Sequence, residues 1–306
     1  MPHSLFGLRV ENLSSDLGVG TGSGRGALDR GPVEILYEKL PTYVGNPLFQ
    51  TETHRVFEDH STYDLPQFPG FRLRATGDSI QLEEGPEGFA GRLDFFLLFL
   101  VVGLAGTHLH RGNLCLHGNA LTDGESALAI LGPREAGKST QSRCLFERGY
   151  GFVCDDLCAI DFSGEKAQIH SGVPFMKLWH QSLAFFPSLA GSDYAKLFDS
   201  DKHLIPIEPK RFRQGCHPLR KLYTLDTSPN ITAPTIRELS GMEKLTALAE
   251  HLYKLDLHLL LPHFPWVLKK LTRLANGVAI AAVERPGDAE FDWSVAELID
   301  RDFREG

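Results

Sequence analysis

Hydrophobic and polar residues alternate in short runs over the first third of the chain. The runs at 33–37, 71–74 and 79–82 place an apolar side chain at about every second position, which is the period of a half-buried strand. Residues 45–69 are rich in proline, aspartate, histidine and threonine, and we assign them to a loop. The pattern predicts a small, mainly antiparallel β-rich region at residues 1–90.

Longer apolar runs replace this alternation after residue 90. Residues 95–106 contain no polar side chain; the run is too short to span a bilayer and is typical of a buried helix. The elements expected next are strands at 113–117 and 126–131, a crossing or turn at 118–124, a helix at 138–148 closed by Gly149, and a strand at 151–154 with a continuation to 160. Strands that alternate with helices favour an α/β domain, which we assign to residues 91–306.

Leucine spacing predicts a helix in the last third of the chain. Ser240 and Glu243 form a capping box, and leucines follow at intervals of three and four up to residue 259. His251 and His258 fall on this helix, and we interpret them as packed or solvent-facing rather than as ligands. The remaining expected elements are a helix at 265–277, a strand at 278–283 and a last helix that Ser294 caps with Glu297.

The net charge and the first residues of the chain limit the partners and the location that we expect. The 306 residues include 31 basic and 39 acidic ones, a formal net charge of −8, whereas a nucleic-acid-binding protein normally shows a basic face. We therefore expect no nucleic-acid partner. The first residues lack the charged-then-apolar order of a signal peptide, so we expect a cytoplasmic protein with no membrane partner. Its oligomeric state stays open, a homo-oligomer included.

The cysteines indicate a reducing environment. They form no C-x-x-C pair, and their odd number favours free thiols over a disulfide framework. Cys154 and Cys158 lie in an apolar run, so we interpret them as buried thiols rather than as metal ligands. The five are Cys115, Cys144, Cys154, Cys158 and Cys216.

A phosphate-binding pattern provides the first candidate chemistry. Residues 132–139 fit G-x-x-x-x-G-K-[ST], in which the glycines let successive backbone N–H groups converge on phosphate oxygens. Lys138 would supply a positive charge for the β- and γ-phosphates, and the Ser139 hydroxyl would bind the Mg²⁺ that accompanies ATP. The expected nucleotide-binding residues are Gly132, Pro133, Arg134, Glu135, Ala136, Gly137, Lys138, Ser139 and Thr140.

The elements on either side of this pattern favour a true phosphate site over a chance glycine-lysine turn. An apolar run at 126–131 precedes it and a predicted helix follows it. This order puts a bound anion at a helix N-terminus, where unpaired N–H groups and the helix dipole favour negative charge.

Asp155 and Asp156 come at the end of the strand predicted at 151–154. A metal-binding acid is expected at the end of a strand that neighbours a phosphate loop. Of two adjacent carboxylates, one can accept the proton of an attacking hydroxyl while the other faces Mg²⁺. Their mutual repulsion would raise the pKa of one of them. The alternative is a structural Asp-Asp turn.

Taken together, these motifs resemble the catalytic domain of the HPr kinase/phosphorylase family. The matching segments are Leu116-His117-Gly118, then residues 132–140, then residues 148–156, which read Arg-Gly-Tyr-Gly-Phe-Val-Cys-Asp-Asp. The resemblance implies a phosphoenolpyruvate-carboxykinase-like P-loop core rather than the ordinary P-loop fold. It also implies that Asp155 is the base for the acceptor hydroxyl, that Asp156 helps to hold metal, and that His117 lies beside the phosphates. A core histidine is the alternative for His117.

The chain departs from that family downstream. The family's Glu-Ile-Arg-Gly-Leu-Gly segment supplies a metal-binding Glu and elements used in phosphorolysis, whereas the corresponding residues 170–179 here contain no Glu. A second metal ligand and phosphorylase activity therefore stay open.

Two segments instead resemble the HPr-kinase-related proteins found with lasso-peptide clusters. They are Pro174–Trp179, with the pattern Pro-x-x-Lys-Leu-Trp, and Asp201–Leu204, with Asp-Lys-x-Leu. The resemblance implies phosphorylation of a serine near the C-terminus of a precursor peptide. It makes Lys177 and Lys202 candidate contacts to phosphate or substrate. The basic stretch around Lys202 is otherwise open to interpretation as a solvated loop.

The sequence thus predicts an ATP- and Mg²⁺-dependent kinase that acts on a serine of a peptide or small protein. The alternatives are a nucleotide-binding regulatory protein without phosphotransfer and a kinase of a free small molecule. A eukaryotic-type protein kinase is excluded, because residues 161–164 read Asp-Phe-Ser-Gly rather than Asp-Phe-Gly and no His-Arg-Asp occurs.

Overall fold

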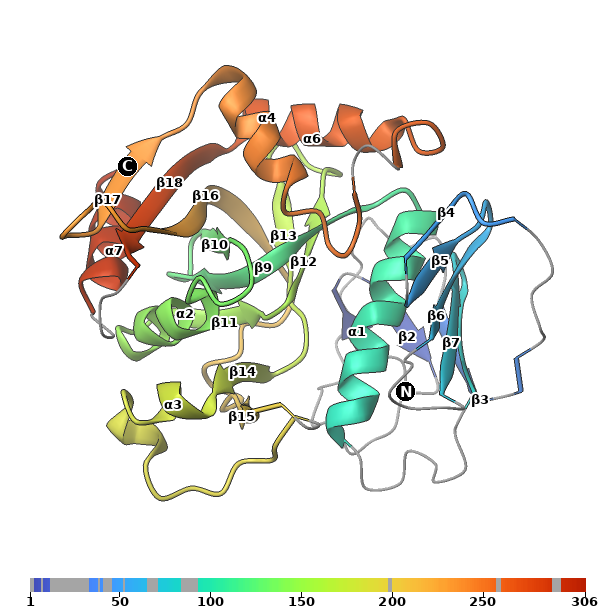
Figure 1. The fold of residues 1–306 in the computed structure, drawn as a ribbon, viewed down its shortest axis with the longest axis horizontal. Coiled ribbons are helices and arrows are strands. Elements are labelled where there is room, and N and C mark those ends of the chain that lie inside the picture. The colour runs from blue at the N-terminus through green and yellow to red at the C-terminus, as the bar shows by residue number, and fades with distance from the viewer. Residues whose placement is uncertain are drawn as a thin grey trace.

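The computed structural model describes residues 3–6, 8–11, 33–37, 39–40, 46–51, 53–64, 71–83, 93–197, 200–256, 260–287 and 293–306. Within these ranges the protein is a mixed α/β structure with several sheets, in agreement with the predicted class (Figure 1). Across the same ranges, no helix combines the length and the apolar character that a membrane crossing requires.

The first sheet contains the described strands that precede residue 84, in the order β1-β2-β3-β8-β7-β6-β5-β4. Its pairs are antiparallel except for β2 with β3 and β3 with β8. The strands are β1 (His3–Leu5), β2 (Leu8–Glu11), β3 (Val33–Tyr37), β4 (Phe49–Gln50), β5 (His54–Val56), β6 (His60–Asp64), β7 (Arg72–Thr76) and β8 (Ser79–Glu83).

The assignment of residues 45–69 to a loop is wrong, because β4, β5 and β6 lie there. The alternation that identifies a strand is missing from this stretch because polar side chains occupy buried positions. In β6, His60, Ser61 and Thr62 are all buried. Hydrophobic periodicity detects a strand only where the buried residues are apolar, so it misses a strand whose buried residues are polar.

Helix α1 (Leu93–His110) lies along one face of this sheet (Figure 1). Two glycines let helix and sheet approach closely, since a Cβ atom at Gly103 would lie 2.8 Å from Ile80 and one at Gly106 would lie 2.7 Å from Ala75. The apolar run predicted as a buried helix therefore packs against the β-rich region.

The second sheet has the order β10-β9-β12-β13-β16-β18-β17, and β11 also pairs with β9. The long strand β9 pairs with β10, β11 and β12. The long strand β16 pairs with β13 in the antiparallel sense and with β10 and β18 in the parallel sense. The strands are β9 (Leu114–Thr122), β10 (Ala127–Leu131), β11 (Gly151–Cys154), β12 (Leu157–Asp161), β13 (Gln168–His170), β16 (Cys216–Ser228), β17 (Thr235–Glu238) and β18 (Ala279–Pro286).

The turn predicted at 118–124 is wrong, because β9 continues to Thr122. Gly118 is needed there for space: a Cβ atom on it would lie 2.6 Å from the carbonyl oxygen of Ile130 on β10. Glycine within a strand often marks such a close approach of another backbone.

Helices cover both faces of this sheet. Alternate residues of β10 enter two different cores: Leu128 and Ile130 pack in the core that contains Phe146 of α2 (Lys138–Glu147) and Phe303 of α7 (Ser294–Glu305). The residues between them, such as Ala129, pack in the core of α4 (Gly241–Ala249) and α6 (Trp266–Gly277). A strand buried on both faces is typical of a sheet between two helical layers.

Two helix ends differ from the predictions. The capping box of Ser240 and Glu243 is present, but α4 stops at Ala249, so His251 lies beyond the helix. Leu252 instead forms a bridge with Leu116 of β9. His258 lies outside the described residues. The last helix begins at Ser294 with Trp293 at its N-cap, so the cap is one residue earlier than predicted.

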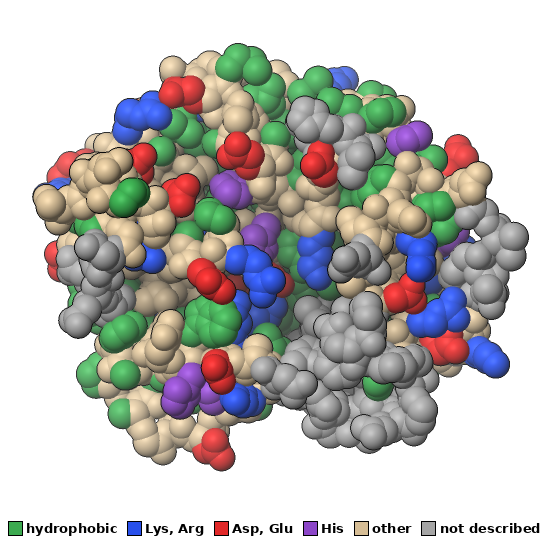
Figure 2. Space-filling view, in the orientation of Figure 1, with side chains coloured by type: hydrophobic (Ala, Val, Ile, Leu, Met, Phe, Trp, Pro, Cys, Tyr) green, Lys and Arg blue, Asp and Glu red, His purple; other side chains and the backbone are tan. Residues whose placement is uncertain are grey.

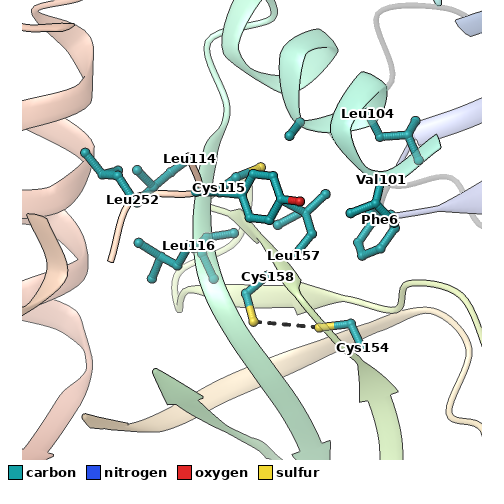
Figure 3. Close-up of a cluster of buried hydrophobic side chains, with 14 of the residues drawn as sticks. Phe6, Val101, Leu104, Leu114, Cys115, Leu116, Cys154, Leu157, Cys158 and Leu252 are labelled. Carbon is teal, nitrogen blue, oxygen red and sulfur yellow. Dashed lines mark hydrogen bonds between the residues drawn. The ribbon is translucent and has the colours of Figure 1, made fainter. Parts of the chain in front are cut away.

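Cys154, the last residue of β11, and Cys158 in β12 are buried free thiols, as expected (Figure 3). The sulfur atoms of Cys154 and Cys158 lie 3.8 Å apart. They belong to a cluster that joins α1 residues such as Val101 to β9 residues such as Leu114. This cluster connects the β-rich region to the second sheet.

Two buried histidines should make the fold sensitive to acid. Burial lowers the pKa of His54 and of His108 to about 3, whereas an unfolded chain has a histidine pKa of about 6.5. Between these values the unfolded state binds more protons, so the free energy of unfolding falls as the pH falls. We expect urea denaturation to show a loss of about 2 kcal/mol per ring between pH 7.5 and pH 5.

The contribution of one ring can be separated with a matched pair of variants. His108→Gln removes a titrating ring from the core and should reduce the pH-dependent loss by about 2 kcal/mol. His263→Gln changes an exposed position and should leave the loss as in the wild type. An unchanged loss in His108→Gln would show that the folded state accepts the proton on His108 without cost.

Candidate active site

The loop at residues 132–137 connects β10 to the N-terminus of α2 and has positive backbone φ at three positions, two of which are glycines. Backbone φ is +151° at Gly132, +68° at Glu135 and +102° at Gly137. A Cβ atom at Gly132 would lie 2.3 Å from the carbonyl oxygen of Leu225 on β16. A loop of this kind at a helix N-terminus can direct successive N–H groups toward one anion.

Gly132→Ala should test how tightly this loop is held. We expect the variant to lose at least about 2 kcal/mol of unfolding free energy more than Gly124→Ala, because overpacking adds to backbone strain. Gly124 is the matched control, since its φ is also positive but a Cβ atom there would meet nothing within 4 Å. Thermal or urea denaturation measures both. Equal losses would mean that the loop can move away from Leu225.

Lys138 folds back over the loop. Its Nζ donates hydrogen bonds to the carbonyl oxygens of Gly132 at 2.7 Å and Pro133 at 2.8 Å. Burial lowers the pKa of Lys138, while Asp155 and Asp156 oppose this shift. The lysine of the loop therefore lies within electrostatic range of both predicted acids.

Of the other predicted loop residues, some are exposed and the rest form hydrogen bonds with neighbouring segments. Pro133, Arg134 and Glu135 are exposed, whereas Ala136 is buried and its carbonyl oxygen accepts a hydrogen bond from Arg285 at 3.0 Å. The two hydroxyls after Lys138 point to different partners. Asn119 on β9 donates to Ser139 Oγ at 3.4 Å, and Thr140 Oγ1 lies 3.3 Å from the hydroxyl of Ser182 on α3 (His180–Leu183).

Asp155 and Asp156 interrupt the pairing with β9. Cys154 pairs with Ala120 and Leu157 pairs with His117, so β11 and β12 are separate strands rather than the single strand predicted to continue to 160. Asp156 has a positive φ of 74°, which is uncommon for a residue other than glycine. The backbone of residues 155 and 156 therefore forms a turn between the two strands.

The Asp155 carboxylate is buried and has an elevated proton affinity. Its Oδ2 accepts a hydrogen bond of 2.6 Å from the backbone N–H of Lys177 on β14 (Phe175–Trp179). Burial raises the pKa of Asp155, Lys177 opposes the shift and Asp156 adds to it. A carboxylate with a raised pKa is better suited to accept a proton than an ordinary one.

The Asp156 carboxylate is held as an anion by three side chains. Its Oδ2 accepts hydrogen bonds from Lys177 Nζ at 2.9 Å and from the Tyr253 hydroxyl at 3.2 Å, and its Oδ1 lies 3.3 Å from His117 Nδ1. Burial alone would raise the pKa of Asp156, but Lys177 and His117 outweigh it and hold the pKa well below its usual range. The two neighbouring acids are therefore tuned in opposite directions, as in many sites that divide acid and base roles.

The hairpin of β14 and β15 (Lys202–Pro206) brings two predicted lysines to these acids. Trp179 pairs with Lys202 across the hairpin, and Lys202 Nζ lies 4.9 Å from the Trp179 ring centre. Burial lowers the pKa of Lys202, against the opposing effect of Asp155 and Asp156. Around the hollow in the middle of the face shown in Figure 2, lysine, arginine and histidine side chains gather.

The segment after α4 adds residues that the sequence did not suggest. His251 accepts a backbone hydrogen bond from His117 at 2.7 Å and Tyr253 donates one to Cys115 at 3.1 Å, so this segment lines β9. That pairing carries the Tyr253 hydroxyl to Asp156 and leaves Lys254 within electrostatic range of the same acid. The sequence did not indicate these residues as part of the site, because the leucine spacing predicted a helix through residue 259.

Comparison with known proteins gives similarity to solved structures alone. No family model matches the chain, and no curated protein matches it. Among solved structures, the HPr(Ser) kinase/phosphatase from Coxiella burnetii superposes with a TM-score of 0.35 and 14% sequence identity, over 62% of this chain and 94% of that chain. A likeness of this degree carries no conclusion about activity.

Proposed function

We propose that this protein is an ATP-dependent kinase that transfers the γ-phosphate to a serine hydroxyl of a peptide or small protein. One observation carries the proposal: Lys138, at the end of a glycine loop and the start of α2, lies within electrostatic range of the buried Asp155 and the partly exposed Asp156. Phosphoryl transfer needs a phosphate cradle and a proton acceptor at the same place. The loop and the two acids come from separate segments of the chain that lie within electrostatic range of each other.

The loop would bind the phosphates of ATP. Its backbone N–H groups and the N-terminus of α2 provide partial positive charge. Lys138 would exchange its two carbonyl partners in the loop for the β- and γ-phosphate oxygens. Lys202, which lies within electrostatic range of Lys138, would add charge where the transferred group becomes most negative.

Asp155 would act as the proton acceptor. The hydrogen bond from the Lys177 N–H fixes Oδ2, and the raised pKa increases the driving force for taking a proton from serine. In the part of the chain that the structure describes, this is the one hydrogen bond to the Asp155 carboxylate. The other oxygen is therefore available to an acceptor hydroxyl.

The donor set fits Mg²⁺, which prefers hard oxygen ligands and accompanies ATP in such sites. The Ser139 hydroxyl and the Asp156 carboxylate would hold it, and the ion would neutralise charge on the phosphates. Asp156 is currently shared by Lys177, Tyr253 and His117, so one of these partners would have to move aside. His117 would then lie beside the phosphates.

The proposal also specifies the type of catalytic core and the acceptor. We propose a phosphoenolpyruvate-carboxykinase-like P-loop core in residues 91–306, with residues 1–90 as a small β-rich N-terminal region, and the C-terminal serine of a lasso-peptide precursor as the acceptor. The acceptor is suggested by the pattern Pro-x-x-Lys-Leu-Trp at Pro174–Trp179, and in the fold this segment places Lys177 against both acids and Trp179 against Lys202.

The proposal is tested by intact-mass analysis of acceptors after incubation with ATP and Mg²⁺. The panel contains peptides that end in serine, their alanine versions, HPr protein and free serine. We expect one phosphate on a serine peptide and none on its alanine version. Phosphate on free serine alone would favour a small-molecule kinase. ATP binding with no phosphorylated acceptor would overturn the kinase in favour of a nucleotide-binding regulatory protein.

A further inference from the structure

Three potential metal ligands from three neighbouring strands converge at a second place in the fold. Asp161 ends β12, His170 ends β13 and Cys216 begins β16. His170 pairs with Cys216 across the two strands. Asp161 is five residues along the chain from Asp156, about 16 Å at the rise of a strand, so the cluster is separate from the proposed active site.

The distances match those within a tetrahedral zinc site. His170 Nε2 lies 3.4 Å from Asp161 Oδ2 and 3.6 Å from Cys216 Sγ, and the three ligand atoms all lie within 4.8 Å of one another. Tetrahedral zinc with ordinary bond lengths holds nitrogen and oxygen ligands about 3.3 Å apart, and nitrogen and sulfur about 3.6 Å apart. The pairs that involve His170 therefore already have the spacing of a bound state.

A catalytic Cys-His-Asp triad does not explain this arrangement. In a triad, histidine uses one ring nitrogen for the nucleophile and the other for the acid. Here both Cys216 and Asp161 approach the same nitrogen, Nε2. When a thiol and a carboxylate both approach one ring nitrogen, a single metal ion placed between the three atoms explains the arrangement better.

The surroundings also suit a metal. Asp161 and His170 are each 3% exposed, whereas Cys216 lies at the surface and leaves a route for entry. Ser163 orients the Asp161 carboxylate with two hydrogen bonds of 2.8 Å, one from its N–H and one from its hydroxyl. Such outer partners are typical of built metal sites.

We propose that Asp161, His170 and Cys216 bind one Zn²⁺ ion, with Gln168 Oε1 or water in the fourth position. Cys216 Sγ now donates to Gln168 Oε1 at 2.7 Å. On binding, the thiol proton leaves for solvent and the S–H bond is replaced by a zinc–sulfur bond, so thiolate and carboxylate together neutralise the ion. The metal joins the β12–β13 hairpin to the start of β16, the strand that pairs with β10 beneath the phosphate loop.

Metal binding to the full-length protein tests this directly. Zn²⁺ affinity is measured by competition with a chromophoric chelator, and Co²⁺ is used as a spectroscopic substitute whose thiolate charge-transfer band reports sulfur ligation. We expect one ion per chain and a higher melting temperature with Zn²⁺. Cys216→Ser, at an exposed position, should weaken Zn²⁺ binding by at least about 100-fold, because even outer partners contribute 10- to 100-fold, and should abolish the Co²⁺ band.

The matched control is His217→Ala, which alters the neighbouring residue on β16 outside the cluster. It should keep both the affinity and the Co²⁺ band. Asp161→Asn should lose affinity but keep the sulfur band, which separates loss of a ligand from loss of the fold. Absence of stoichiometric Zn²⁺ binding, or equal affinity in Cys216→Ser and wild type, would overturn the site. Loss of binding in Asp155→Asn with the Co²⁺ band absent would place the metal at the proposed active site instead.

Discussion

Asp155→Asn should abolish phosphate transfer while ATP binding stays nearly intact. The amide keeps the shape of the carboxylate, and its oxygen can still accept the hydrogen bond from the Lys177 N–H that now reaches Asp155 Oδ2 at 2.6 Å. What the variant loses is the capacity to take a proton. General base catalysis contributes about 10²- to 10⁴-fold, so we expect the rate to fall by at least about 100-fold. Intact-mass time courses measure the rate, and titration with a fluorescent ATP analogue measures binding.

Asp156→Asn tests whether the two acids have different roles. Because Asp156 holds Lys177, Tyr253 and His117, its amide variant should weaken Mg²⁺-dependent ATP binding as well as transfer. The opposite pattern, in which Asp155→Asn loses ATP binding and keeps residual transfer, would show that Asp155 mainly holds metal. That outcome would exchange the roles of the two acids and leave the kinase proposal standing.

The glycine loop is the part of the candidate site whose position the sequence predicts best. Its glycines, lysine and hydroxyl are close together in sequence, so spacing alone defines residues 132–140 as a candidate phosphate loop. The structure places the loop between β10 and α2 as expected. Local chemistry that depends on neighbouring residues is visible in a sequence, because no tertiary contact is needed to bring it together.

Residues that act through tertiary contacts were harder to predict. Tyr253 reaches Asp156 because the chain leaves α4 and lines β9, and nothing in the local spacing indicates that route. Lys177 was suggested by its motif, but its contact with both acids depends on the packing of β14. The Asp161, His170 and Cys216 cluster joins residues up to 55 positions apart, beyond the reach of any spacing rule for metal ligands.

The errors in the predicted fold have a common physical origin. Hydrophobic periodicity identifies a strand only where burial and polarity agree. In β6 the buried residues are polar, and at Gly118 a glycine provides room for β10 instead of marking a turn. Likewise, the leucine pattern continued past Ala249 although the helix ended there, since Leu252 is buried against β9 rather than on a helical face.

Lys177→Met should reverse the way in which the site responds to pH. In the wild type, Lys177 and His117 keep the pKa of Asp156 well below its usual range, so this acid stabilises the fold above the unfolded pKa and loses that effect as the pH falls through its folded pKa. Without Lys177, burial would dominate and raise the pKa of Asp156. Losing one partner of a buried ion pair costs about 3–5 kcal/mol, and since the pair is partly accessible, with 14% and 20% exposed side chains, we expect about 3 kcal/mol at pH 8.

The loss in Lys177→Met should then shrink as the pH is lowered toward 5, because protonation of the unpaired acid relieves its burial as a charge. Urea denaturation of wild type and variant at several pH values gives the difference directly. Lys202→Met is the matched control: Lys202 lies on the same hairpin within range of both acids but forms no ion pair with Asp156 in the described structure. Its loss should be smaller and should vary little with pH. A Lys177→Met loss that does not change with pH would mean that Lys177 stabilises the site by packing, and that Asp156 keeps its charge through His117 and Tyr253 alone.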